Sequence, residues 1–174
     1  MSAELARWQA ILDKHWERFE TREISFQDQR RCRVREHLGL ELDDSATDEA
    51  YAVYQCGYEA AWRLLPGVFE FLTRTIDIPK VVVTNGQREV QIRKIRATGL
   101  QPHVIGIVTP SDCGHWKPSA AIFEAALDLL QLPASECLMI GDDLSKDIEP
   151  ARRLGMRSFH VQSGSNLFDA LGSS

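Results

Sequence analysis

The sequence lacks most of the features that mark secreted, membrane-bound or nucleic-acid-binding proteins. Only four cysteines occur in 174 residues and no two form a Cys-x-x-Cys pair, so we expect reduced thiols in a cytoplasmic protein. No apolar run approaches the roughly 20 residues of a membrane span. Charges recur every few positions in the first twenty residues, unlike a secretory signal. The formal net charge of −5 argues against nucleic acid as a main partner.

The N-terminal third of the chain carries only helical patterns. Apolar side chains recur at spacings of three and four, which predicts a first helix: Leu5, Trp8, Leu12, Trp16 and Phe19. Ser25 with Asp28 resembles a capping box that opens a second helix, and Gly39 ends it. Ser45 with Asp48 predicts the start of a third helix.

Four arginines fall in the stretch RRCRVR, residues 30–35. We interpret them as a solvated helix face with acidic neighbours, since charge runs on helices are usually stabilised in that way. Docking against an anionic substrate or another domain is the alternative.

From about residue 65 the pattern changes to alternating strands and helices. The expected strands cover 80–84, 103–108, 137–140 and 157–161, and the expected helices cover 88–99, 118–131 and 146–155. Alternation at this spacing predicts a parallel sheet with right-handed crossovers. We therefore expect an all-α domain over 1–64 and an α/β domain with a Rossmann-like parallel sheet over 65–174.

Residues that directly follow the expected strands matter most, because ligands of open parallel sheets bind at the carboxyl ends of the strands. The first strand is followed by Thr84, Asn85 and Gly86. A hydroxyl and backbone N–H groups before a helix suit an anion such as phosphate. Helix capping by Thr84 is the structural alternative.

Lys117 follows the second strand and precedes a proline at an expected helix start. An ammonium group in this place could hold a phosphate as a point charge. An ordinary surface lysine before a helix is the alternative.

Three carboxylates follow the third strand within six residues: Asp142, Asp143 and Asp147. Like charges this close repel one another, so some partner must compensate them. Asp142 and Asp147 can both reach the strand-end face, and paired carboxylates with open coordination positions suit Mg²⁺. Asp143 or Ser145 could instead cap the following helix, and both interpretations can hold together.

The order of these motifs, a strand ending in TNG, a Lys-Pro helix start and a strand ending in GDD with a later Asp, resembles the haloacid dehalogenase-like (HAD) hydrolase superfamily. The phosphatase type with an α-helical cap fits best, with 1–64 as the cap and 65–174 as the core. The resemblance implies that Thr84 and Lys117 are catalytic and that Thr84, Asn85, Gly86 and Lys117 bind phosphate. It also implies that Asp142 and Asp147 hold Mg²⁺.

The nucleophile motif of that family, Asp-x-Asp-x-Thr after an apolar strand, is absent from the 174 residues. The nearest stretch, LELDDSATD (40–48), has no apolar strand before it and is interpreted as a helix cap. We expect a chain that begins inside the cap and lacks the first, central strand of the sheet. Because unpaired backbone groups are costly, we expect one of three outcomes: the strands ending at Thr84 and Ile140 pair directly, a further segment or chain fills the gap, or upstream residues exist beyond these 174.

The leading hypothesis is a Mg²⁺-dependent phosphatase of a small phosphorylated metabolite, acting through an aspartyl-phosphate in the full-length protein. The chain as written is expected to be nearly inert, so a non-catalytic relative that binds phosphate or a protein partner stays open. Haloacid dehalogenase chemistry is disfavoured by GDDLSKD, and a response-regulator domain is disfavoured by the motif order. An unpaired central sheet edge would favour a homo-oligomer.

Overall fold

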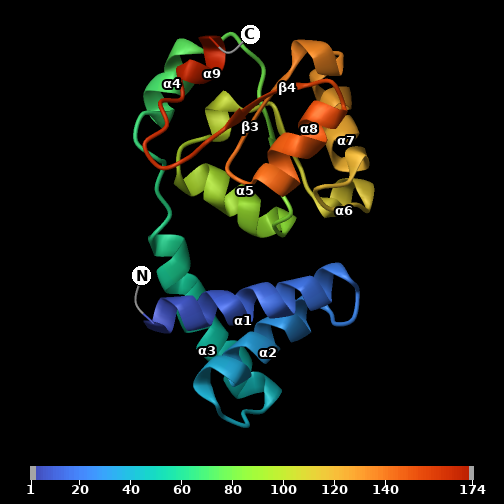
Figure 1. Ribbon diagram of the computed structural model, residues 1–174. Coiled ribbons are helices and arrows are strands. Elements are labelled where there is room, and N and C mark those ends of the chain that lie inside the picture. Colours follow the sequence, from blue (N-terminus) through green and yellow to red (C-terminus); the bar gives the residue numbers. More distant parts are fainter. Residues whose placement is uncertain (1–2, 173–174) are drawn as a thin grey trace. The chain divides into compact units, whose positions relative to one another are not determined.

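The computed structural model describes residues 3–172 (Figure 1). The chain separates into two compact units that divide between Ala61 and Trp62. The first is the helical unit and the second is the α/β unit. Within residues 3–172, no helix has both the length and the apolar character needed to cross a bilayer.

The helical unit contains α1 (Ala3–Glu20), α2 (Phe26–Leu38) and α3 (Asp44–Ala60). The capping box of Ser25 and Asp28 is confirmed at the start of α2, and Gly39 ends that helix with a φ of 65°. The predicted start of the third helix at Ser45 is wrong. The N-cap is instead Asp43, two residues before Ser45. Its carboxylate accepts the N–H of Ala46 at 2.8 Å, a donor that has no partner within the helix. This also confirms that the stretch 40–48 is a helix cap.

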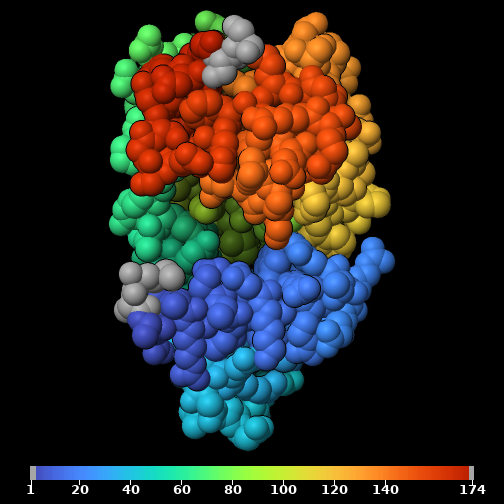
Figure 2. All heavy atoms as spheres, viewed as in Figure 1, coloured from blue at the N-terminus to red at the C-terminus, as the bar shows by residue number. Residues whose placement is uncertain are grey.

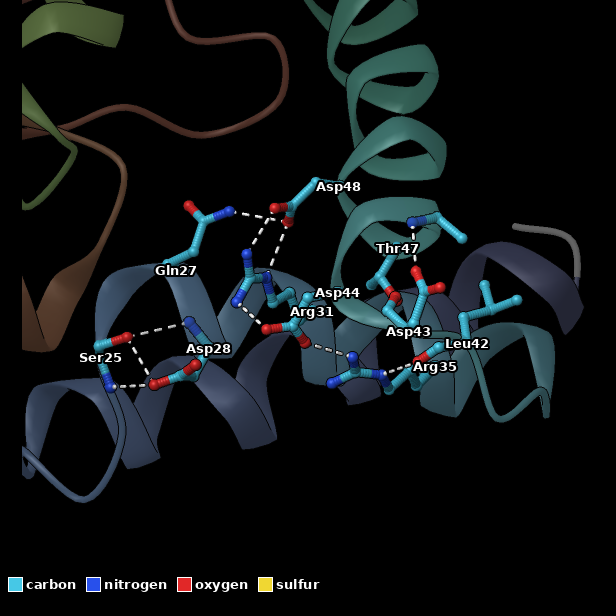
Figure 3. Close-up of polar contacts among 11 residues, drawn as sticks. Ser25, Gln27, Asp28, Arg31, Arg35, Leu42, Asp43, Asp44, Thr47 and Asp48 are labelled. Carbon is cyan, nitrogen blue, oxygen red and sulfur yellow. Dashed lines mark hydrogen bonds and ion pairs between the residues drawn. The ribbon is translucent and has the colours of Figure 1, made fainter.

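The arginine run on α2 divides between two environments. Arg31 donates to both carboxylate oxygens of Asp48 at 2.9 and 2.6 Å and to Asp44 at 2.5 Å, while Arg35 donates to the other oxygen of Asp44 at 2.6 Å (Figure 3). The hydrogen bond from Arg31 lowers the pKa of Asp48. The prediction of acidic neighbours is therefore confirmed for these two arginines, which tie α2 to the start of α3.

Arg33 departs from that prediction because it is only 4% exposed. Its guanidinium carbon lies 4.7 Å from the centre of the Trp8 ring and 5.8 Å from that of Tyr54. Aromatic faces stabilise a desolvated cation, so Arg33 belongs to the core of the helical unit.

The α/β unit alternates strands and helices, as predicted. Its strands are β1 (Val81–Val83), β2 (Gly106–Val108), β3 (Leu138–Gly141) and β4 (Arg157–His160). Its helices are α4 (Val68–Arg74), α5 (Arg88–Ala97), α6 (Pro110–Cys113), α7 (Ala120–Leu130), α8 (Glu149–Arg153) and α9 (Asp169–Gly172), with short turns η1 (Gln101–His103), η2 (Ala134–Glu136) and η3 (Leu144–Ile148). Every strand pair is parallel, which confirms the Rossmann-like class.

The sheet is split into two halves. β1 pairs with β2 and β3 pairs with β4, but within residues 3–172 no strand pairs with the remaining edges of β1 and β3. Direct pairing of these two strands, one of the stated expectations, is therefore wrong. Both strands instead line one cavity of about 720 Å³, together with apolar residues such as Phe71 and Leu72 of α4.

The core of the α/β unit lies under α7. Ile122, Phe123 and Ala126 of this helix are buried against Val108 of β2 and Ala151 of α8. Since α7 packs on β1, β2 and α8, it holds together parts of both half-sheets.

The C-terminal segment covers another part of this unit. Phe168 lies 5.8 Å from Phe71 of α4, measured between ring centres. In Figure 2 this segment, in red, lies beside the orange residues around α8 and forms one visible face of the α/β unit. Packing of this kind fixes the chain after β4 without adding a strand.

Candidate active site

The turn after β1 is built by Thr84. Its N–H donates to the carbonyl of Val108 at 3.0 Å, which extends the pairing of β1 with β2 by one residue. Its hydroxyl oxygen accepts the N–H of Gly86 at 3.1 Å. α5 begins after Gln87 with no side-chain cap, so Thr84 shapes the turn and does not cap the helix.

Asn85 connects this turn to the loop that carries Lys117. Its Oδ1 accepts the backbone N–H of Lys117 at 2.7 Å, and its Nδ2 donates to the carbonyl of the same residue at 3.0 Å. These two bonds join positions 32 residues apart and bring Lys117 to the carboxyl end of β1.

The Lys117 side chain forms an ion pair with Asp147. Its Nζ lies 2.5 Å from Oδ1 of Asp147, and the two side chains are 14% and 5% exposed. The other oxygen of Asp147 accepts the N–H of Asp143 at 3.2 Å. A buried carboxylate with both oxygens bonded satisfies the usual requirement for a charge out of water. Lys117 is therefore a partly buried member of a charge pair and not an ordinary surface lysine.

Asp143 caps the turn η3, as one of the two interpretations predicted. Its Oδ1 accepts the N–H groups of Ser145 and Lys146, both at 2.9 Å. Burial raises the pKa of Asp143, but the hydrogen bonds from Lys146 and Ser145 outweigh it, so the pKa lies below its ordinary value. η3 is a π-helical turn, a geometry frequent at functional sites.

Asp142 lies exposed at the start of this loop. Its backbone carbonyl accepts a hydrogen bond from Nε2 of His160 at 3.1 Å, which ties the loop to the end of β4. No role was predicted for His160, and its place at the end of an expected strand was the only available signal. Across residues 3–172, no group of three or more His, Cys, Asp or Glu side chains could hold a metal. A Mg²⁺ site at Asp142 and Asp147 stays a prediction.

Gly141 makes room for the Asp147 carboxylate. A Cβ atom added to Gly141 would lie 2.4 Å from Oδ2 of Asp147 and 2.6 Å from its Cβ. Contacts this short force the neighbouring group to move, so the last residue of β3 must be glycine for Asp147 to meet Lys117.

Replacing this glycine is expected to destabilise the protein. Gly141→Ala should lower the free energy of unfolding by about 1–3 kcal/mol, as overpacking typically does, in a urea titration. The control is Gly57→Ala within α3, where an added Cβ meets nothing within 4 Å and the better helix propensity of alanine should stabilise by about 1 kcal/mol. Equal effects of the two changes would contradict the close approach at Gly141.

The structure thus links three predicted site residues by direct contacts, Asn85, Lys117 and Asp147. Thr84 and Gly86 lie in the same turn as Asn85. The family of the chain is shown by a comparison with family models: residues 2–155 match the haloacid dehalogenase-like hydrolases. The chain belongs to this family.

Individual HAD-like relatives agree with this assignment. The chain is 31% identical over 126 residues to haloacid dehalogenase-like hydrolase domain-containing protein 3 of Xenopus laevis, a match that covers 71% of this chain and 51% of the relative. It is 32% identical over 83 residues to a glyceraldehyde 3-phosphate phosphatase of Methanocaldococcus jannaschii, covering 48% of this chain and 36% of that enzyme. The chain therefore spans about half or less of the length of these curated relatives.

The fold agrees as well. The crystal structure of the HAD-hydrolase YfnB from Bacillus subtilis, bound to magnesium, superposes with a TM-score of 0.77 at 23% identity. The match covers 96% of this chain and 76% of that one. This similarity establishes the HAD fold, with its α/β core and helical cap, for the chain.

Proposed function

We propose that this HAD-like hydrolase is a Mg²⁺-dependent phosphatase that hydrolyses a small phosphate monoester. The observation that carries the proposal is the Lys117 ammonium group, held 2.5 Å from Asp147 beside the carboxyl end of β1. A fixed cation at this edge of a parallel sheet is suited to a phosphoryl group. The name of the phosphatase relative from Methanocaldococcus jannaschii supports a substrate of this class.

Two groups of the chain would hold the phosphoryl oxygens. Lys117 would neutralise part of their negative charge, because a phosphate monoester repels any anionic nucleophile until cations surround it. The hydroxyl of Thr84 accepts the Gly86 N–H, so its own proton is directed elsewhere and could be donated to a phosphoryl oxygen.

The metal would be held by carboxylates of the loop after β3. Asp142 is exposed and Asp147 is buried, and carboxylate oxygens are the ligands that Mg²⁺ prefers, with water completing the shell. The chemistry of the donors therefore fits Mg²⁺. When bound, the ion would polarise a phosphoryl oxygen as a Lewis acid. Asp147 would share its charge between the ion and Lys117, so Asp142 is the freer ligand.

The nucleophile would come from outside these 174 residues, since they contain no Asp-x-Asp-x-Thr stretch. A strand entering the cavity between β1 and β3 would find backbone partners on both sides and apolar side chains around it. Its carboxyl end would then lie at the same edge as Lys117. We propose that a further segment or chain occupies this place in the active protein.

The proposal is tested by titrating inorganic phosphate into the chain in the presence of Mg²⁺, followed by calorimetry. Lys117→Met should weaken phosphate binding by about tenfold or more, because a charge-assisted contact is lost. The matched control is Lys94→Met on α5, which should leave the affinity unchanged.

Loss of Lys117 leaves the buried Asp147 without its cation, which could unfold the α/β unit. The double variant Lys117→Met/Asp147→Asn removes both charges and should fold and bind phosphate weakly. Wild-type affinity in a folded Lys117 variant, or no binding by the wild type, would overturn the proposal.

The alternative is a non-catalytic HAD-like protein that binds phosphate or a protein partner. The specific observation in its favour is the absence of the nucleophile motif from the 174 residues. A phosphatase and a phosphate-binding relative would both bind phosphate, and neither predicts normal turnover by these 174 residues. The presence or absence of an in-frame strand with Asp-x-Asp-x-Thr in the coding DNA ahead of Met1 separates the two hypotheses.

A further inference from the structure

We infer that Asn85 is a positioning residue that acts on phosphate through Lys117, and that it is not itself a phosphate ligand. The inference rests on the proposed function, since it assigns a role within the same site. It replaces the sequence-based expectation that Asn85, like Thr84, contacts phosphate directly.

The carboxamide of Asn85 makes two hydrogen bonds to the backbone of Lys117. Oδ1 accepts the N–H of Lys117 at 2.7 Å and Nδ2 donates to its carbonyl at 3.0 Å. One hydrogen bond would leave the Lys117 backbone free to rotate about it, whereas two bonds from a planar amide fix both position and orientation. Asn85 thus imitates a backbone peptide group of a neighbouring strand.

The Lys117 ammonium group needs such a support because of where it lies. The side chain is 14% exposed and its partner Asp147 is 5% exposed, so the pair sits where charges interact strongly and are costly to separate. A small shift of the Lys117 backbone would lengthen the contact of 2.5 Å with Asp147. Misplacement of about 1 Å can cost an active site on the order of a hundredfold.

The same contacts connect the two half-sheets. β1 and β3 are not paired as strands. Asn85 follows β1, and Asp147 lies in η3 after β3. Lys117 contacts both residues and so connects the ends of the two strands. Asn85, Lys117 and Asp147 therefore form one polar relay at the carboxyl ends of the strands. Removing the Asn85 side chain should break the contact between the Lys117 backbone and the turn after β1. The Lys117 ammonium group would then no longer be held in a fixed position beside Asp147.

The first test measures the position of Lys117 without using phosphate. Acetylation of Lys117 by an amine-reactive reagent, followed by mass spectrometry, reports how often its amine leaves Asp147. Asn85→Ala should raise the rate about fivefold to tenfold, as expected for the loss of hydrogen bonds that stabilise a buried group. Gln101→Ala, which removes an exposed carboxamide of the same unit, is the control and should leave the rate unchanged.

The second test is a double-mutant cycle on phosphate affinity. If Asn85 acts through Lys117, Asn85→Ala should weaken binding about tenfold in the wild type and have almost no further effect in Lys117→Met/Asp147→Asn. A direct phosphate ligand would instead show equal losses in both backgrounds, which would overturn the inference. So would an unchanged acetylation rate in Asn85→Ala.

A second variant keeps the inference testable if Asn85→Ala does not fold. Asn85→Asp keeps an oxygen for the Lys117 N–H but loses the donor to the carbonyl, so its acetylation rate should lie between those of wild type and alanine variant. Thermal unfolding by circular dichroism checks both variants. If the wild type fails to bind phosphate, the proposed function fails, while the acetylation result still decides the role of Asn85.

Discussion

The 174-residue chain is expected to hydrolyse an aryl phosphate on the order of a millionfold more slowly than a HAD-like phosphatase that carries Asp-x-Asp-x-Thr. Loss of a covalent nucleophile has an effect of this size in a well-studied protease. Lys117 and Thr84 can lower the barrier only for an attack that another group performs. The measurement is release of the aryl alcohol with excess Mg²⁺, at enzyme concentrations high enough to detect single turnovers.

The control for this assay is the same chain with Lys117→Met/Asp147→Asn. Because the expected rate is that of the background, both proteins should give equal traces. Turnover that matches a normal family member, and that disappears in the double variant, would show that the described residues hold a nucleophile that the sequence does not reveal. The coding DNA ahead of Met1 then distinguishes the two hypotheses, since an in-frame strand with Asp-x-Asp-x-Thr favours the phosphatase and its absence favours the non-catalytic relative.

Phe123→Ala should lower the free energy of unfolding by about 3–5 kcal/mol, the typical cost of removing a buried ring. Phe123 of α7 is 1% exposed and belongs to the buried cluster that also contains Val108 of β2 and Ala151 of α8. It also lines the cavity between the half-sheets, so the space it leaves would join a space that already exists. Against a total stability of about 5–15 kcal/mol, this loss should shift the urea midpoint strongly.

Leu129→Ala is the matched control on the same helix. Leu129 is 49% exposed, so its removal should cost less than about 1 kcal/mol. Urea unfolding followed by circular dichroism compares the two variants. A loss at Phe123 no larger than that at Leu129 would contradict the assignment of this core.

Local patterns in the sequence were enough for most of the elements and for the family, although they did not predict the short helices α4 and α6. Helix capping depends on hydrogen bonds between residues a few positions apart, so the local sequence predicts it. Examples are the capping box of Ser25 and Asp28, the glycine after α2 and the cap at Asp143. The first three strands appear because short apolar runs end at threonine, or at glycine followed by a charged residue. The order of TNG, Lys-Pro and GDD is likewise a property of the chain itself.

Some errors came from competition between local signals. Asp43 and Ser45 both suit a helix start, and the sequence alone favoured Ser45 with its acid three residues later. In the structure Asp43 is the cap of α3, because its carboxylate accepts the Ala46 N–H. Arg33 appeared to be one of four solvated arginines, and only packing against Trp8 made it a core residue.

The tertiary structure alone decided how the site is assembled. Asn85 and Lys117 are 32 residues apart and Lys117 and Asp147 are 30 apart, so no local pattern could pair them. The split between β1–β2 and β3–β4 is also non-local, since strand pairing depends on how helices such as α7 pack on both halves. The sequence by itself determined which residues stand at the strand ends and hence the family. Which of them touch one another was determined by packing, because distances between remote segments are set only when the whole core forms.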